Sequence, residues 1–202
     1  MSRFKGSKGI IILIILVVLV GGYYAYLSNR MGPTEEETED PAALTQTQLV
    51  LSRDLETNYP PTPREVVKYF SDVTQCFYDE EHDDEELKKL GLKMRGIYDE
   101  ELIANQTEEE YIDLLKADVQ EYRDNNRIII SYSPSGSMDV ETYTHEGHEC
   151  AKLYCMYDIK QDSLVYHTNI VFVLRKDDDG HYKIYGWKNV KNEEAGEFNG
   201  EM

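Results

Sequence analysis

Hydrophobic and polar residues follow three different patterns along this chain of 202 residues. Residues 9–29 form one uncharged run, GIIILIILVVLVGGYYAYLSN. From about residue 63 to residue 124, hydrophobic residues recur every three or four positions, which predicts amphipathic helices. From residue 127 to residue 190 they alternate with polar residues, which predicts half-buried β-strands. The order of these regions predicts an N-terminal transmembrane helix followed by an α+β domain.

The uncharged run is long enough to cross a bilayer, because a helix of that length spans roughly 31 Å. Three basic residues precede residue 9, whereas acidic residues follow Arg30. This bias predicts a cytoplasmic N-terminus. We therefore expect a single-pass protein of the cell membrane, anchored in the lipid bilayer through residues 9–29, with an extracellular C-terminal domain. The alternative is a cleaved signal peptide, with Gly21 and Gly22 near the cleavage site.

Composition predicts how the rest of the chain is divided. Residues 1–8 are expected to form a basic cytoplasmic tail, and residues 30–58 an acidic linker. Within that linker, the leucines of residues 41–58 leave a short helix and an edge strand open. Residues 59–191 are enough for one folded domain. Residues 192–202 are expected to be a disordered tail.

Capping signals and helical spacing predict three helical segments in the domain. Thr62 and Thr107 each begin a capping box, with a glutamate three residues later. The middle segment is expected to break at Gly91 or Gly96. The three segments cover about residues 63–79, 87–102 and 107–124.

Five strands follow, separated by turn residues such as glycine, aspartate and serine. Because the connections are short, neighbouring strands should be antiparallel. One face of the sheet, which includes Leu153 and Phe172, should pack on the helices. The expected strands are 127–133, 137–145, 148–161, 163–176 and 181–190.

This order of helices and strands, ending in HYKIYGWKNV, resembles the NTF2-like (cystatin-like) α+β cone over about residues 60–190. The phrase RDLETNYPPTP at residues 53–63, with the apolar run ahead of it, also resembles a family of single-span proteins of unknown function from Gram-positive bacteria. The second resemblance implies a surface-tethered domain without a known activity. Some NTF2-like members are ketosteroid-isomerase-like enzymes, but none of their catalytic residues aligns with this sequence.

Charge and cysteine content limit the chemistry. The chain has 39 acidic and 21 basic residues, a net charge of −18, which argues against nucleic-acid binding. Its cysteines are Cys76, Cys150 and Cys155, and no C-x-x-C spacing for zinc or thiol redox chemistry occurs. Free thiols are therefore expected. Cys150 and Cys155 should point to opposite faces of one strand.

Two histidines are the candidate metal ligands. His145 and His148 flank a two-residue hairpin turn, where neighbouring Cβ atoms lie about 5 Å apart. Glu149 or Cys150 could add a third ligand. The competing interpretation is a polar hairpin tip without metal, which two histidines alone do not exclude. We expect no cofactor.

Two further features carry weaker predictions. His167 lies within an apolar strand, where it could act as a general base inside the cone with Asp158 or a tyrosine as partner. Trp187, Tyr185 and Tyr154 could form an aromatic patch for a carbohydrate or peptide. Sheet-surface and packing roles are the alternatives that the sequence favours for these residues.

Taken together, these patterns predict a non-catalytic role: binding of an unidentified protein partner or a small ligand at the cell envelope. A homodimer through the sheet face is the expected self-association. The alternatives are an isomerase- or hydratase-type enzyme with its site in the cone, or a structural component of an envelope complex. An enzyme of that kind needs a buried acid or base facing an apolar cavity, so a filled cone would exclude it.

Overall fold

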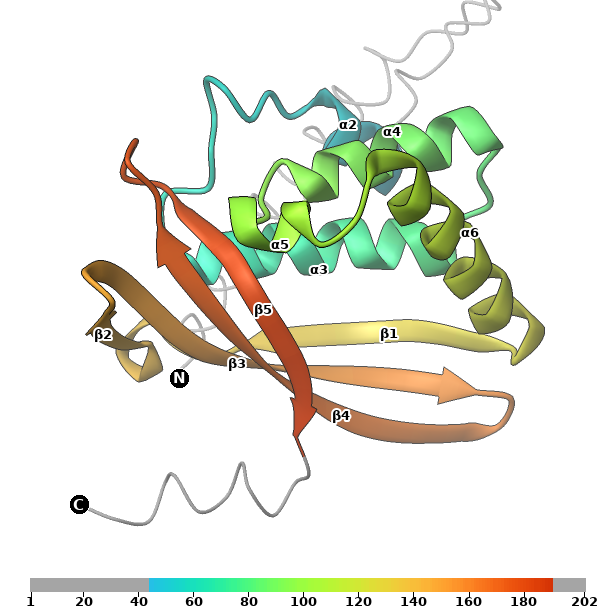
Figure 1. Cartoon of the computed structure of the whole chain (residues 1–202). Coiled ribbons are helices and arrows are strands. Elements are labelled where there is room, and N and C mark those ends of the chain that lie inside the picture. The colour runs from blue at the N-terminus through green and yellow to red at the C-terminus, as the bar shows by residue number, and fades with distance from the viewer. Residues whose placement is uncertain (1–43, 191–202) are drawn as a thin grey trace, which may run out of the picture. The chain divides into compact units, whose positions relative to one another are not determined.

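The computed structural model describes residues 44–190, in which α-helices lie over one face of a five-stranded antiparallel sheet (Figure 1). α3, α5 and α6 contact the sheet, whereas α2 and α4 pack on other helices. The helices are α2 (Gln46–Ser52), α3 (Pro63–Asp79), α4 (Asp84–Arg95), α5 (Glu100–Ala104) and α6 (Glu108–Asp124). The strands are β1 (Arg127–Pro134), β2 (Glu141–His145), β3 (His148–Gln161), β4 (Leu164–Lys176) and β5 (Tyr182–Val190).

The predicted fold class needs one correction. The α+β part is confirmed, but no helix within residues 44–190 is both long enough and apolar enough to cross a membrane. The predicted anchor, residues 9–29, and the predicted tails, residues 1–8 and 192–202, lie outside the described residues. The single-pass topology and the cell-membrane location that depended on this anchor are therefore not supported by the structure.

Part of the expected linker is folded. Thr45 caps α2 with a reciprocal capping box, because its hydroxyl accepts from the Gln48 N–H while its own N–H donates to the Gln48 side chain. Thr47 and Val50 on this helix are buried, and α2 packs on α3 and α4. The open choice between helix and edge strand for this segment is thus decided in favour of a helix, which belongs to the core.

The main helices begin where the capping signals predicted. Thr107 forms the full capping box of α6 with Glu110. At α3, Thr62 accepts the Glu65 N–H and Pro63 occupies the first helical position, but the Glu65 carboxylate lies near Arg64 instead of completing the box.

The middle segment breaks at Gly96 and not at Gly91. Gly96 caps the end of α4, and α5 begins four residues later. Gly91 lies inside α4 against α6, where an added Cβ would be 2.8 Å from Ile112 Cδ1. A glycine at this position therefore allows two helices to pack closely, which outweighs its low helix propensity.

The sheet has the order β1–β3–β4–β5. β1 and β2 pair with opposite ends of the same edge of β3. The predicted inner face is confirmed, since Leu153 and Phe172 are opposite one another and fully buried. The strand predicted over residues 137–145 is wrong at its start, because Ser137–Asp139 form a 3₁₀ turn before β2.

Two irregularities shape the functional region. An extra residue, Tyr185, interrupts the register of β5 between Ile184 and Gly186, as in a β-bulge. The segment between α4 and α5 hydrogen-bonds to the same strand: the Asp99 N–H donates to Ile184 O (2.9 Å), and the Ile184 N–H donates to Ile97 O (2.8 Å). These bonds hold the start of α5 against β5.

The cysteines have the predicted state. Cys76, Cys150 and Cys155 are free and buried. Cys155 faces the helices beside Leu153, whereas Cys150 lies on the opposite face of β3, so the two thiols cannot bridge each other.

Candidate functional site

A cavity of about 790 Å³ lies between the helices and the inner face of the sheet. Its lining comes from α3, α4, α5, α6 and four strands, so no single segment builds it. On β4 the lining residues are Tyr166, Thr168 and Ile170, which alternate along the strand as an inward face requires. The interior of the domain is therefore not filled.

Aromatic rings form most of one wall. Trp187 of β5 packs against Phe70 of α3, with ring centroids 5.2 Å apart, and against Tyr98, at 5.5 Å. Tyr98 in turn meets Tyr111 of α6 edge to face. Trp187 is the only tryptophan of the chain and is 42% exposed. It is thus a built-in optical probe of the cavity.

A tyrosine–aspartate pair links α3 and α6 at another part of the wall. Tyr78 donates a hydrogen bond to Asp118, and its ring stacks on Tyr122 with centroids 4.0 Å apart. Burial, together with the Asp118 carboxylate, raises the pKa of Tyr78 far above its ordinary range. Tyr78 therefore stays protonated and acts as a donor. Asp118 is the only carboxylate among the described residues that line the cavity.

Three basic side chains also line the cavity, although the chain as a whole is strongly acidic. Arg95 lies over the ring of Tyr111 (5.5 Å), and Arg127 over the ring of Tyr122 (5.9 Å). Lys188 completes the set. In the part of the chain that the structure describes, none of these three forms an ion pair.

Two polar atoms in this lining are unsatisfied. The Nε of Arg127 and the hydroxyl of Tyr122 are buried, and neither has a hydrogen-bond partner within residues 44–190. A buried polar group without a partner costs about 1–3 kcal/mol. Such groups are rare in folded proteins, so a pair of them on neighbouring side chains of a cavity calls for an explanation.

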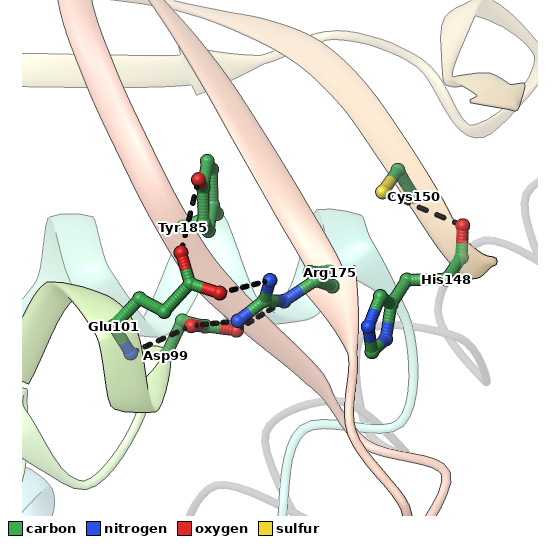
Figure 2. A network of polar contacts seen from close by, with 6 residues as sticks. All are labelled: Asp99, Glu101, His148, Cys150, Arg175 and Tyr185. Carbon is green, nitrogen blue, oxygen red and sulfur yellow. Dashed lines mark hydrogen bonds and ion pairs between the residues drawn. The ribbon is translucent and has the colours of Figure 1, made fainter. Parts of the chain in front are cut away.

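A smaller groove of about 450 Å³ lies on the outer face of the sheet, beside the network in Figure 2. Arg175 on its wall binds Asp99 through Nε (2.9 Å) and Nη2 (2.5 Å), and Glu101 through Nη1 (2.7 Å). The guanidinium also lies 4.8 Å from the ring centre of Tyr185, whose hydroxyl donates to Glu101. Arg175 thus fixes the bulged tyrosine in place.

The predicted metal ligands lie on this groove. His145 and His148 face each other across the β2–β3 turn, as expected. However, Glu149 binds Lys176 and Tyr182, and the Cys150 thiol donates to the His148 carbonyl. Within residues 44–190 no three His, Cys, Asp or Glu side chains are grouped in a way that could hold a metal ion.

His167 has the sheet-surface position that the sequence favoured over a general base inside the cone. His167 does pair with Asp158 (2.5 Å), but the imidazole is 59% exposed and lies on the outer face of the sheet, away from the cavity. Of the predicted aromatic patch, Trp187 and Tyr185 line the outer groove, whereas Tyr154 does not.

Several cavity residues were not singled out from the sequence. The usable signal was a polar residue on an apolar helix face, since Asp118 shares the inner face of α6 with Tyr111 and Tyr122. Arg127 carried no local signal, because it is the first residue of β1 and only its pairing in the sheet turns it inward beside Ile129.

Comparison with known proteins adds a family but no activity. Residues 1–187 match the family described as Domain of unknown function (DUF6715). No curated protein matches the chain.

Proposed function

Because the chain belongs to the DUF6715 family, whose function is unknown, we propose a role from the cavity itself: non-catalytic binding of a small, partly apolar ligand between the helices and the sheet. The observation that carries this proposal is an aromatic-walled cavity of about 790 Å³. Sites for small molecules are typically 300–1,000 Å³ in volume, mostly apolar, and contain a few placed polar groups. The lining fits this description.

The architecture supports the NTF2-like relationship as part of the same proposal. Helices cover one face of an antiparallel sheet (Figure 1). The cavity lies between these two layers, where a cone-shaped domain of that kind would hold a ligand. Binding in this space, and not at the outer groove, is the role that we propose.

An isomerase- or hydratase-type enzyme is the second candidate, because the interior is not filled. The observation that favours it is the Tyr78–Asp118 pair, a possible acid–base couple at the cavity wall. Asp118 itself is exposed, whereas general bases of this class are usually tuned by burial. An Asp118→Asn variant separates the two roles: a binding protein keeps its ligand affinity, whereas an enzyme loses turnover of the ligand once that ligand is known.

The proposal can be tested with an uncharged aromatic probe, N-phenylnaphthylamine, and the fluorescence of Trp187. We expect saturable binding with one probe per chain and quenching of Trp187, which lines the cavity. Thr168→Phe adds a ring on the inner face of β4 and should abolish binding.

The matched control is Val165→Phe on the same strand, which adds the same ring on the exposed outer face and should leave binding unchanged. Both variants must unfold cooperatively, because a loosely folded chain also binds such probes. Equal binding by wild type and Thr168→Phe would refute the proposal.

A further inference from the structure

The proposed ligand site contains charges that its apolar walls do not require. Among the described residues, Arg95, Arg127 and Lys188 line the cavity together with a single carboxylate, Asp118, and Lys188 also borders the outer groove. Asp118 is exposed and already accepts a hydrogen bond from Tyr78. The cavity therefore has an excess of positive charge inside a protein whose net charge is −18.

The basic side chains are also available. Elsewhere in the domain, Arg175 is neutralised by Asp99 and Glu101 (Figure 2). Arg53 and Arg123 instead donate hydrogen bonds to backbone carbonyl groups. Arg95 and Arg127 lie only over tyrosine rings, and no carboxylate among the described residues pairs with either of them. Arg127 differs from the other arginines because its buried Nε has no acceptor within residues 44–190, a need that an anion from outside would satisfy.

The unsatisfied atoms place that anion. Arg127 lies over the ring of Tyr122, and the Arg127 Nε and the Tyr122 hydroxyl are both buried donors without an acceptor within residues 44–190. Burial makes ionisation of the Tyr122 hydroxyl unfavourable and so raises its pKa, which keeps it a hydrogen-bond donor. A guanidinium beside a hydroxyl donor suits a carboxylate, which accepts several hydrogen bonds in one plane.

We propose that the cavity binds an organic acid, with the carboxylate held by Arg127 and Tyr122 and the apolar or aromatic body lying along the ring wall formed by Tyr98 and Trp187. This proposal rests on the proposed function, because it names the class of ligand for the same cavity. It adds a polarity to the site, with the acid group at the start of β1 and the body toward β5.

The test compares three molecules with the same body and different head groups: phenylbutyrate, phenylbutyramide and phenylbutylamine. Each is titrated against the protein loaded with N-phenylnaphthylamine, and displacement is read from probe fluorescence. We expect the acid to bind about tenfold more tightly than the amide, because a hydrogen bond to a charged group is roughly twice as strong as a neutral one. The amine should bind most weakly. Added salt should weaken only the acid.

Two variants assign the anchor. Arg127→Gln should remove most of the preference for the acid over the amide while leaving the amide affinity within about twofold. Tyr122→Phe removes only the hydroxyl and should reduce the preference by about threefold. The control is Lys160→Gln, which removes the same charge from the exposed outer face of β3 and should leave the preference unchanged.

The outcomes separate the two proposals. If neither the probe nor any of the three molecules binds, the cavity is not a ligand site and the proposed function fails. If the probe binds but the amide binds as tightly as the acid, the function stands and the acid class is wrong. An acid preference that survives intact in Arg127→Gln overturns the assigned anchor.

Discussion

Burial, more than charge, should decide which of two carboxylates on Arg175 stabilises the fold. Asp99 and Glu101 bind the same guanidinium at similar distances, 2.5 Å and 2.7 Å for the closest contacts (Figure 2). The Asp99 side chain is 6% exposed and that of Glu101 is 61% exposed, so truncating each one is a matched comparison. We predict a large loss of stability for Asp99→Ala and a small loss for Glu101→Ala.

The magnitudes follow from the local structure. Removing one partner of a buried ion pair costs about 3–5 kcal/mol, and the 17% exposure of Arg175 places this case near the lower end. Asp99 also caps α5 by accepting the Glu101 N–H, which is worth about 1 kcal/mol. We therefore expect Asp99→Ala to lose roughly 3–4 kcal/mol. Glu101→Ala should lose far less, because an exposed ion pair is screened by solvent.

Urea unfolding, followed by Trp187 fluorescence and by circular dichroism, measures both losses, provided that the denaturant slope is unchanged. A third variant, Arg175→Met, tests the cause. This variant leaves the buried Asp99 carboxylate without its cation, so adding Asp99→Ala to it should lower stability little or not at all. Equal losses for Asp99→Ala and Glu101→Ala, or additive losses in the double variant, would refute the reasoning.

Three further predictions concern the core. Gly91→Ala should lower stability by about 1–2 kcal/mol despite alanine's higher helix propensity, because the new Cβ would lie 2.8 Å from a methyl carbon of α6. The control in thermal unfolding is Gly186→Ala, which has no atom within 4 Å of the added Cβ and should show no such loss. Burial raises the pKa of Asp72 above its ordinary 3.8, so the folded chain keeps this proton to a higher pH than the unfolded chain and loses stability as pH rises through that interval. The stability of Asp72→Asn relative to the wild type should therefore increase as pH rises from strongly acidic to neutral. If urea unfolding gave the same difference in free energy of unfolding at every pH, the reasoning would be wrong. Burial raises the pKa of Cys76 and of Cys155 to about 11, so a thiol reagent at neutral pH should label them only after unfolding, and rapid labelling of the native protein would show the thiols to be accessible.

The sequence by itself determined the elements whose signals are local. A capping threonine, a proline at the first helical position and a glutamate three residues later act within one turn, which is why α3 and α6 begin where predicted. Period-two alternation acts along one strand, so the inner face of β3 and β4 could be identified before any pairing was known. The pairing of His145 with His148 was also local, because a two-residue turn imposes it.

Only the tertiary structure decided what depends on residues far apart in the chain. The middle helix continues through Gly91 because α6 packs there, and Arg175 is held by Asp99, 76 residues away. The cavity has no sequence signature, since four helices and four strands each contribute a few residues to its wall and none builds it alone. Arg127 and Tyr122 became a candidate anion site only because packing buried their donors and supplied no acceptor, which is a property of the assembled core and of no single segment.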